Sequence, residues 1–136
     1  MANYCCAVRT NYFRVKDAEA FKKFMEGVYN AESGTISVWE KKCDSNTLFA
    51  FGCFGSICGI KESDEYDDFI DGLQKYVAED DAIIIWESGN EKLRYLTGTA
   101  EIITTGSYEC IDIRSLAISK AAELLKNPDW ETDDAY

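Results

Sequence analysis

The chain reads SDEYDDFIDGLQKYVAEDDAIIIW at residues 63–86, and this stretch decides the fold. Its first part is amphipathic, because apolar side chains recur at helical spacing at Tyr66, Phe69, Ile70, Leu73, Tyr76 and Val77. Ser63 is a favourable N-cap for this helix. The run 82–86 contains three isoleucines, which is typical of a central strand buried on both faces. The sequence therefore predicts a helix that leads into the middle of a sheet.

The residues before this stretch predict a strand, a helix and a hairpin. Residues 4–15 alternate and are rich in β-formers, which favours a strand. Asp17 can cap a helix whose apolar stripe is expected to end near Tyr29. Residues 36–42 and 47–54 favour two strands, and the turn formers between them indicate a hairpin.

Three glycines mark the link between the hairpin and the central helix. Gly52, Gly55 and Gly59 punctuate an apolar segment that lacks the lysine of a phosphate-binding loop and the spacing of the dinucleotide fingerprint. Acidic residues follow and would repel a phosphate. We interpret the segment as a tight crossover from strand to helix, and we predict no cofactor.

The residues after the central strand predict two more strands and a last helix. Turn formers at 88–91 precede a long strand over 93–105, in which a glycine indicates a bulge, and a short strand over 108–113. Ser115 is the expected cap of the last helix. Residues 129–136 form an acidic tail.

The order of these elements predicts an α+β fold. It is β-α-β-β-α-β, the ferredoxin-like pattern, followed by a C-terminal β-hairpin extension and a helix. We expect an antiparallel sheet with the helices on one face. The 136 residues suit one domain over 1–128, with 129–136 as its tail.

Composition favours a folded cytoplasmic protein. Apolar residues make up 46% of the chain, which argues against disorder, and no apolar run is long enough to span a membrane. The start lacks the features of a signal peptide, so we expect a cytoplasmic location and six free thiols.

The charge balance narrows the class of partner. The chain has 25 acidic and 14 basic residues, for a net charge of −11. Such a chain repels nucleic-acid phosphates, so direct binding of nucleic acid is disfavoured, whereas a basic protein surface would attract it.

Catalysis and metal binding find little support in the residue types. The chain contains no histidine, which excludes Ser-His-Asp and Cys-His triads, and a nucleophilic cysteine would need another activator. Carboxylate pairs stay open, but acids are too abundant for any pair to be informative. The adjacent Cys5 and Cys6 and the single pair Cys53 and Cys58 do not make the two knuckles of a structural zinc site. We therefore predict no enzyme activity and no metal.

An acidic surface on the central helix is the candidate site. Asp64, Asp68 and Asp71 follow i, i+4, i+7, so in a helix they would span about 10.5 Å. The mean spacing per charge would then be close to the roughly 3.4 Å per phosphate along one DNA strand. We predict that a basic surface of a protein partner binds here. The predicted partner-binding residues are Asp64, Glu65, Asp67, Asp68, Asp71, Glu79, Asp80 and Asp81. The alternative is that these charges only keep an exposed helix face solvated.

Two short segments carry a resemblance to a known group of proteins. Residues 1–17, which include MANYC and RTNYFRVKD, and residues 89–96, GNEKLRYL, resemble small proteins of bacterial plasmids, phages and conjugative elements, and the YubP-type ferredoxin-like domain. The resemblance implies a mobile-element accessory protein. Small acidic proteins of that origin often inhibit host defence, some by imitating DNA.

Three hypotheses about function follow. The first is a non-enzymatic acidic binding protein that inhibits a host nucleic-acid-handling protein of defence or restriction. The second is a small-ligand-binding or enzymatic domain with a pocket on the open sheet face, near Trp86, Arg94 and Tyr95. The third is a homodimer that forms through that sheet face.

Overall fold

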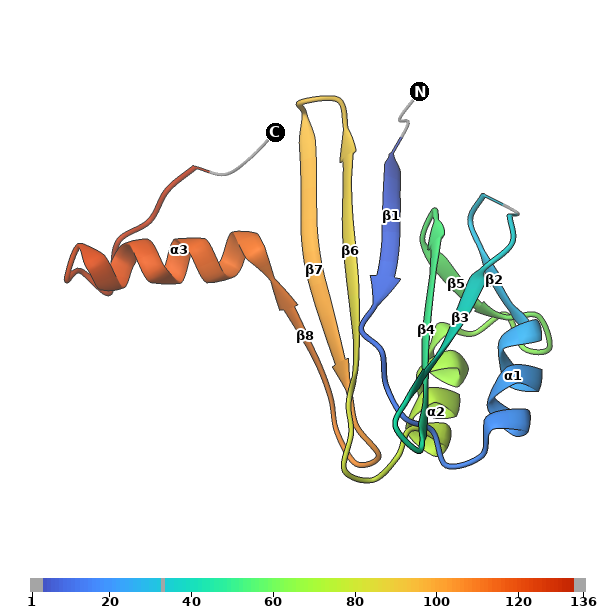
Figure 1. The fold of residues 1–136 in the computed structure, drawn as a ribbon. Coiled ribbons are helices and arrows are strands. Elements are labelled where there is room, and N and C mark those ends of the chain that lie inside the picture. The colour runs from blue at the N-terminus through green and yellow to red at the C-terminus, as the bar shows by residue number, and fades with distance from the viewer. Residues whose placement is uncertain (1–3, 33, 134–136) are drawn as a thin grey trace.

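The computed structural model describes residues 4–32 and 34–133 and shows an α+β protein (Figure 1). These residues form three helices, a six-stranded antiparallel sheet and a separate two-stranded sheet. The predicted α+β class is confirmed. Residues 1–3 of the first resemblance segment and residues 134–136 of the predicted tail lie outside the described residues.

The large sheet places the N-terminal strand in its interior. In spatial order its strands are β3 (Ser37–Cys43), β4 (Asn46–Phe54), β1 (Cys5–Thr10), β6 (Ile83–Glu91), β7 (Tyr95–Ile103) and β8 (Tyr108–Asp112). The predicted central position of this strand is confirmed, because β6 pairs with β1 on one side and with β7 on the other. The expected burial on both faces is wrong, because Trp86 is 47% exposed. Ile83 and Ile85 point into the core, and Ile84 between them points to the opposite face.

Two helices cover one face of this sheet. These are α1 (Ala18–Glu26) and α2 (Tyr66–Tyr76). Asp17 caps α1 as predicted, because its carboxylate accepts a hydrogen bond of 3.1 Å from the Ala20 backbone N–H. The core between these helices and the sheet is aromatic, and its fully buried members include Phe13, Phe21, Phe49, Phe51 and Phe69.

A small sheet lies where the sequence predicted only connections. Helix α1 ends at Glu26 rather than near Tyr29, because the chain continues into β2 (Val28–Asn30). The glycine-marked segment contains β5 (Ile57–Ile60), which pairs with β2. The prediction of a plain crossover was therefore wrong. Gly59 permits this path, since its φ is +152° and a side chain there would meet the backbone of Glu65.

The start of α2 differs from the prediction. Ser63 does not cap the helix, because the N–H groups of Ser63 and Asp64 both bond to the carbonyl of Ile60 in a turn. Asp64 has a φ of +61°, so it cannot continue a right-handed helix. The helix consequently begins at Tyr66, with Glu65 as its N-cap.

The hairpin of β6 and β7 is longer than predicted. The turn expected at 88–91 lies within β6, and the chain instead reverses between Glu91 and Tyr95. Gly98 pairs with Ser88 in an uninterrupted register, so the expected bulge is absent there. Gly98 instead gives room to Ile113, whose Cγ2 would lie 2.9 Å from a Cβ at this position.

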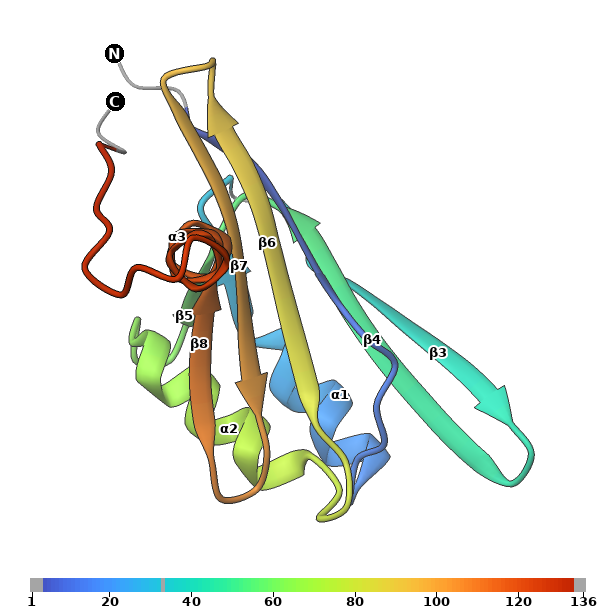
Figure 2. The same ribbon diagram turned by 90° about the vertical axis from the view of Figure 1, so that its left-hand side faces the viewer.

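The last helix does not lie on the same face as the other two. Helix α3 (Ile113–Leu124) stands out from the opposite face of the sheet (Figures 1 and 2). Its N-cap is Asp112, whose carboxylate accepts from the Arg114 N–H at 2.9 Å, and not the predicted Ser115. Because β8 ends at Asp112 and Ile113 packs on Gly98, the chain leaves the sheet on its uncovered side. The prediction of all helices on one face was wrong.

Candidate functional site

Three exposed aspartates on α2 form the centre of the acidic surface. The buried side chains of Phe69, Ile70 and Leu73 fix the rotation of the helix, so Asp67, Asp68 and Asp71 face the solvent. No ion pair within residues 4–32 and 34–133 involves these three aspartates. The nearest cation on the helix, Lys75, lies 5.4 Å from the ring centroid of Tyr76. None of the three charges is therefore held in an ion pair in this part of the chain, and the one cation on the same helix, Lys75, lies four residues after Asp71.

Two further acids extend this surface before the helix begins. Asp64 is exposed, and its carboxylate accepts a hydrogen bond of 3.0 Å from the hydroxyl of Tyr29. Glu65 is exposed and makes no side-chain capping bond. The helix dipole favours negative charge at this end, which stabilises Asp67 and Asp68 in the first turn. We call Asp64, Glu65, Asp67, Asp68 and Asp71 the α2 acidic surface.

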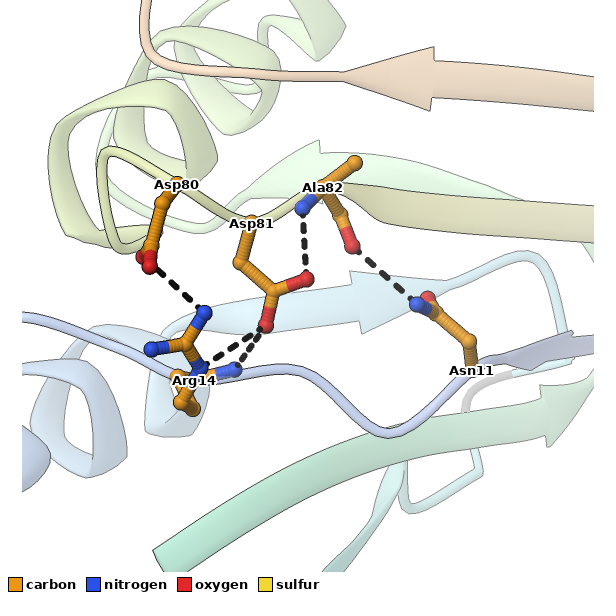
Figure 3. A network of polar contacts seen from close by, with 5 residues as sticks. All are labelled: Asn11, Arg14, Asp80, Asp81 and Ala82. Atoms are coloured by element: carbon orange, nitrogen blue, oxygen red, sulfur yellow. Dashed lines mark hydrogen bonds and ion pairs between the residues drawn. The ribbon is translucent and has the colours of Figure 1, made fainter. Parts of the chain in front are cut away.

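Two of the other predicted acids, Asp80 and Asp81, make contacts that hold the fold together (Figure 3). The Arg14 guanidinium pairs with Asp80 at 2.9 Å and with Asp81 at 3.5 Å. Asp81 also accepts from the backbone N–H groups of Arg14 and Ala82, both at 2.8 Å. These bonds hold the approach to β6 against the segment after β1. Arg14 pairs with both of these charges, so of the 79–81 cluster only Glu79 is exposed without an ion pair among the described residues.

A half-buried carboxylate network lies beside the α2 acidic surface, and the sequence did not predict it. Glu101 of β7 accepts hydrogen bonds from Tyr66 of α2, at 2.6 and 2.8 Å, and from Tyr108 of β8, at 2.6 Å. Glu101 lies two residues before the buried Ile103 in β7, so both side chains point to the helix-covered face. An acidic residue at this position of the strand pattern was the signal that could have revealed the network. The network joins α2 to the edge of the sheet and adds one more negative charge on that side.

Both tyrosines of the network hold their protons tightly. Burial, followed by the hydrogen bond to Glu101 and its charge, raises the pKa of Tyr66 above the usual range. The same causes raise the pKa of Tyr108, and the charge of Asp67 adds to the effect. A phenol that donates to a carboxylate is favoured in its neutral form.

This network predicts a loss of stability in alkali. The unfolded tyrosines titrate near pH 10, and the folded ones at higher pH, so above about pH 10 the unfolded chain releases protons first. The contribution of these tyrosines to the free energy of unfolding is fully present below about pH 10 and is lost as the pH rises further. Tyr66→Phe should cost about 1.5–3 kcal/mol at pH 7 and make the alkaline decline shallower. Urea unfolding between pH 7 and 11 measures both effects, and an unaltered alkaline slope would contradict the assignment.

A cavity of about 750 Å³ lies between α1, β2 and β3. Its wall carries the cations Lys22 and Lys61 and the anions Glu26 and Asp64. Lys22 is already paired with Glu40 at 3.0 Å. The mixed charges do not converge on one kind of ligand, and the cavity lies on the helix-covered side of the sheet.

This cavity is not the pocket that the sequence predicted on the open sheet face. Trp86, Arg94 and Tyr95 do not line it. Trp86 points to the open face, and Arg94 pairs with Glu91 at the turn of the β6–β7 hairpin. A second hollow, which does lie on the open sheet face, is lined by residues that include Ala7, Phe54, Ser88 and Leu96, and Trp86, Arg94 and Tyr95 do not line it.

The residue types that could support a reactive or metal centre are dispersed. None of the six cysteines forms a disulfide, and burial raises the pKa values of the Cys53 and Cys110 thiols, which disfavours the nucleophilic thiolate. In the described part of the chain no three Cys, Asp or Glu residues are grouped so that they could hold a metal ion. Over the same residues, no helix has the length and apolar character needed to cross a bilayer.

The chain was compared with protein families, curated proteins and solved structures. No protein-family model, curated protein or solved structure matches the chain.

Proposed function

We propose that the chain is a non-enzymatic binding protein whose α2 acidic surface docks on a basic surface of another protein. The observation that supports this proposal is the exposure of Asp67, Asp68 and Asp71, none of which forms an ion pair among the described residues. Like charges three and four residues apart destabilise a helix by a few tenths of a kcal/mol for each pair. A basic partner would relieve this repulsion.

The spacing of the charges favours a partner that handles nucleic acid. Residues 67–71 rise about 6 Å along the helix axis, in unequal steps of about 1.5 and 4.5 Å between the three aspartates, which is a mean of roughly 3 Å. This is close to the roughly 3.4 Å of axial rise per phosphate on one DNA strand. A phosphate-binding groove would meet a similar row of charges, and the resemblance to mobile-element proteins makes a host defence or restriction protein our proposed target.

The scaffold for this surface is, on our proposal, a ferredoxin-like core. Its elements are β1, α1, β3, β4, α2 and β6, and their strands lie in the order β3-β4-β1-β6. That order supports the interpretation, with β2 and β5 as an insertion and β7, β8 and α3 as an extension.

The proposal is tested by neutralising the three helical aspartates. The variant Asp67→Asn, Asp68→Asn, Asp71→Asn keeps the side-chain size and removes three charges. Binding of a fluorescent oligo-arginine peptide is measured by anisotropy at low and high salt. We expect the variant to bind about tenfold more weakly, because exposed charge pairs contribute about 0.2–1 kcal/mol each.

A matched control separates a local site from net charge. The variant Glu19→Gln, Glu26→Gln, Asp44→Asn also removes three exposed charges, at α1 and at the β3–β4 turn. It should bind the peptide within about twofold of the wild type. An equal loss in both variants would show that only the total charge matters, and the α2 acidic surface would then be rejected as the site.

A further inference from the structure

Helix α3 is rich in apolar side chains for an exposed helix. Five of its residues are polar: Ser115, Ser119 and Glu123 recur every four residues, and Arg114 and Lys120 lie elsewhere on the circumference. The other seven are apolar and include Ile113, Leu116, Ile118 and Leu124. A helix with so wide an apolar surface is normally enclosed by other elements.

The structure nevertheless leaves this helix uncovered. None of its residues is buried, and Leu116 and Leu124 are 53% and 74% exposed. Figure 2 shows α3 end-on, in front of the sheet and separate from α1 and α2. Twelve residues are marginal for an isolated helix in water, so its stability requires packing that the single chain does not provide.

The sheet face on the same side is also uncovered and apolar. Trp86 lies opposite Arg9 on one side and Ala100 on the other, and Ala100 lies opposite Ile111. Trp39 packs beside this row, over Gly52. The face thus exposes two tryptophans and an isoleucine along one row, with Arg9 between the tryptophans and Ala100 between Trp86 and Ile111.

Helix α3 cannot cover its own sheet face. No linker separates β8 from α3, because the strand ends at Asp112 and the helix begins at Ile113. The Asp112 carboxylate caps the first turn, and Ile113 packs on Gly98. These contacts fix the direction in which the helix leaves the sheet.

We propose that a second copy of this chain binds α3 on its open sheet face, and that the exchange is reciprocal. Both surfaces lie on the same side of one molecule, so a two-fold axis pairs each helix with the other copy's sheet and closes the assembly. At about 1.5 Å per residue α3 is roughly 18 Å long, which is the width of about four strands.

The charges on the two surfaces favour this partner. Arg9 stacks on Trp39 at 4.2 Å, and Lys41 lies 5.4 Å from the ring of Tyr12, with no carboxylate at ion-pair distance of either cation among the described residues. The segment that follows α3 presents the exposed acids Asp129 and Glu131. In the reciprocal dimer this acidic segment reaches the basic and aromatic region of the other copy.

The dimer is independent of the proposed acidic docking site. The α2 acidic surface lies on the helix-covered side, and α3 stands on the other side (Figure 1). Failure of one proposal leaves the other unaffected.

Sedimentation equilibrium of the full chain tests the proposal. The expected mass is twice the chain mass of 15.3 kDa. Leu124→Glu on the helix and Trp86→Glu on the sheet should each weaken the dimer about thirtyfold or more, as for a central interface residue. Leu93→Glu, at a hairpin position 89% exposed, is the control and should leave the dimer intact. Circular dichroism verifies that each variant is folded.

Mixing the two variants distinguishes a helix on a sheet from two paired helices. The Trp86→Glu copy keeps an intact helix, and the Leu124→Glu copy keeps an intact sheet face, so the mixture retains one of the two contacts. We expect the mixture to associate more strongly than either variant alone. A wild type that sediments as a single chain, a dimer that resists both variants, or a mixture without recovery would each overturn the proposal.

Discussion

Phe69→Ala is expected to lower the free energy of unfolding by about 3–5 kcal/mol. The ring is fully buried and packs against three other aromatic rings, with centroid distances of 6.3 Å to Phe24, 6.0 Å to Phe51 and 5.5 Å to Tyr66. It is therefore the point at which α1, α2 and the sheet meet. Truncation leaves a cavity that these rings cannot fill without moving out of contact with one another.

Urea unfolding followed by circular dichroism at one protein concentration measures this loss. A domain of this size has about 5–15 kcal/mol of stability, so the variant should unfold at a much lower urea concentration. Leu93→Ala, at an exposed hairpin position, should change the midpoint little. A loss below about 1 kcal/mol for Phe69→Ala would mean that the aromatic core is packed differently.

Gly59→Ala should lower the free energy of unfolding by about 2–4 kcal/mol. Two causes add together. The φ of +152° is strained for a residue with a side chain, and the new Cβ would lie 2.8 Å from the carbonyl oxygen of Glu65. Since that obstacle is backbone, it can be relieved only by moving the start of α2.

Gly106→Ala provides the matched comparison. A Cβ at Gly106 would meet nothing within 4 Å, so this variant should be neutral or slightly stabilised by a less flexible unfolded chain. Both variants are compared by urea unfolding. Equal midpoints would contradict the tight approach of β5 to α2.

The sequence predicted the elements whose signals are local. The apolar stripe of α2 is confirmed, because its spacing follows directly from the helical period. Asp17 was recognised as a cap from its own side chain, and the hairpin of β3 and β4 from its turn formers. Each of these signals lies within a few residues of the structure it specifies.

Features that depend on distant contacts could not be predicted in the same way. Gly89 and Asn90 are turn formers by type, yet they lie in β6 because β1 and β7 pair with it on both sides. A Cβ at Gly89 would lie 2.6 Å from the carbonyl oxygen of Cys5, so the glycine permits close strands and does not reverse the chain.

The candidate site shows the same division. The helical period correctly places Asp68 and Asp71 on one exposed side of α2. It failed for Asp64, which precedes the helix in a left-handed conformation. It also could not reveal that Asp81 pairs with Arg14, since that partner is far away in the sequence.

The interior position of β1 has a consequence for synthesis of the protein. This strand leaves the ribosome early, but both of its neighbours come later in the chain, and β6 is complete only at Glu91. Until then the nascent chain carries an incomplete sheet with unpaired backbone groups, which is the kind of species that chaperones protect. Translation must therefore pass about two-thirds of the chain before the sheet can close around its first strand.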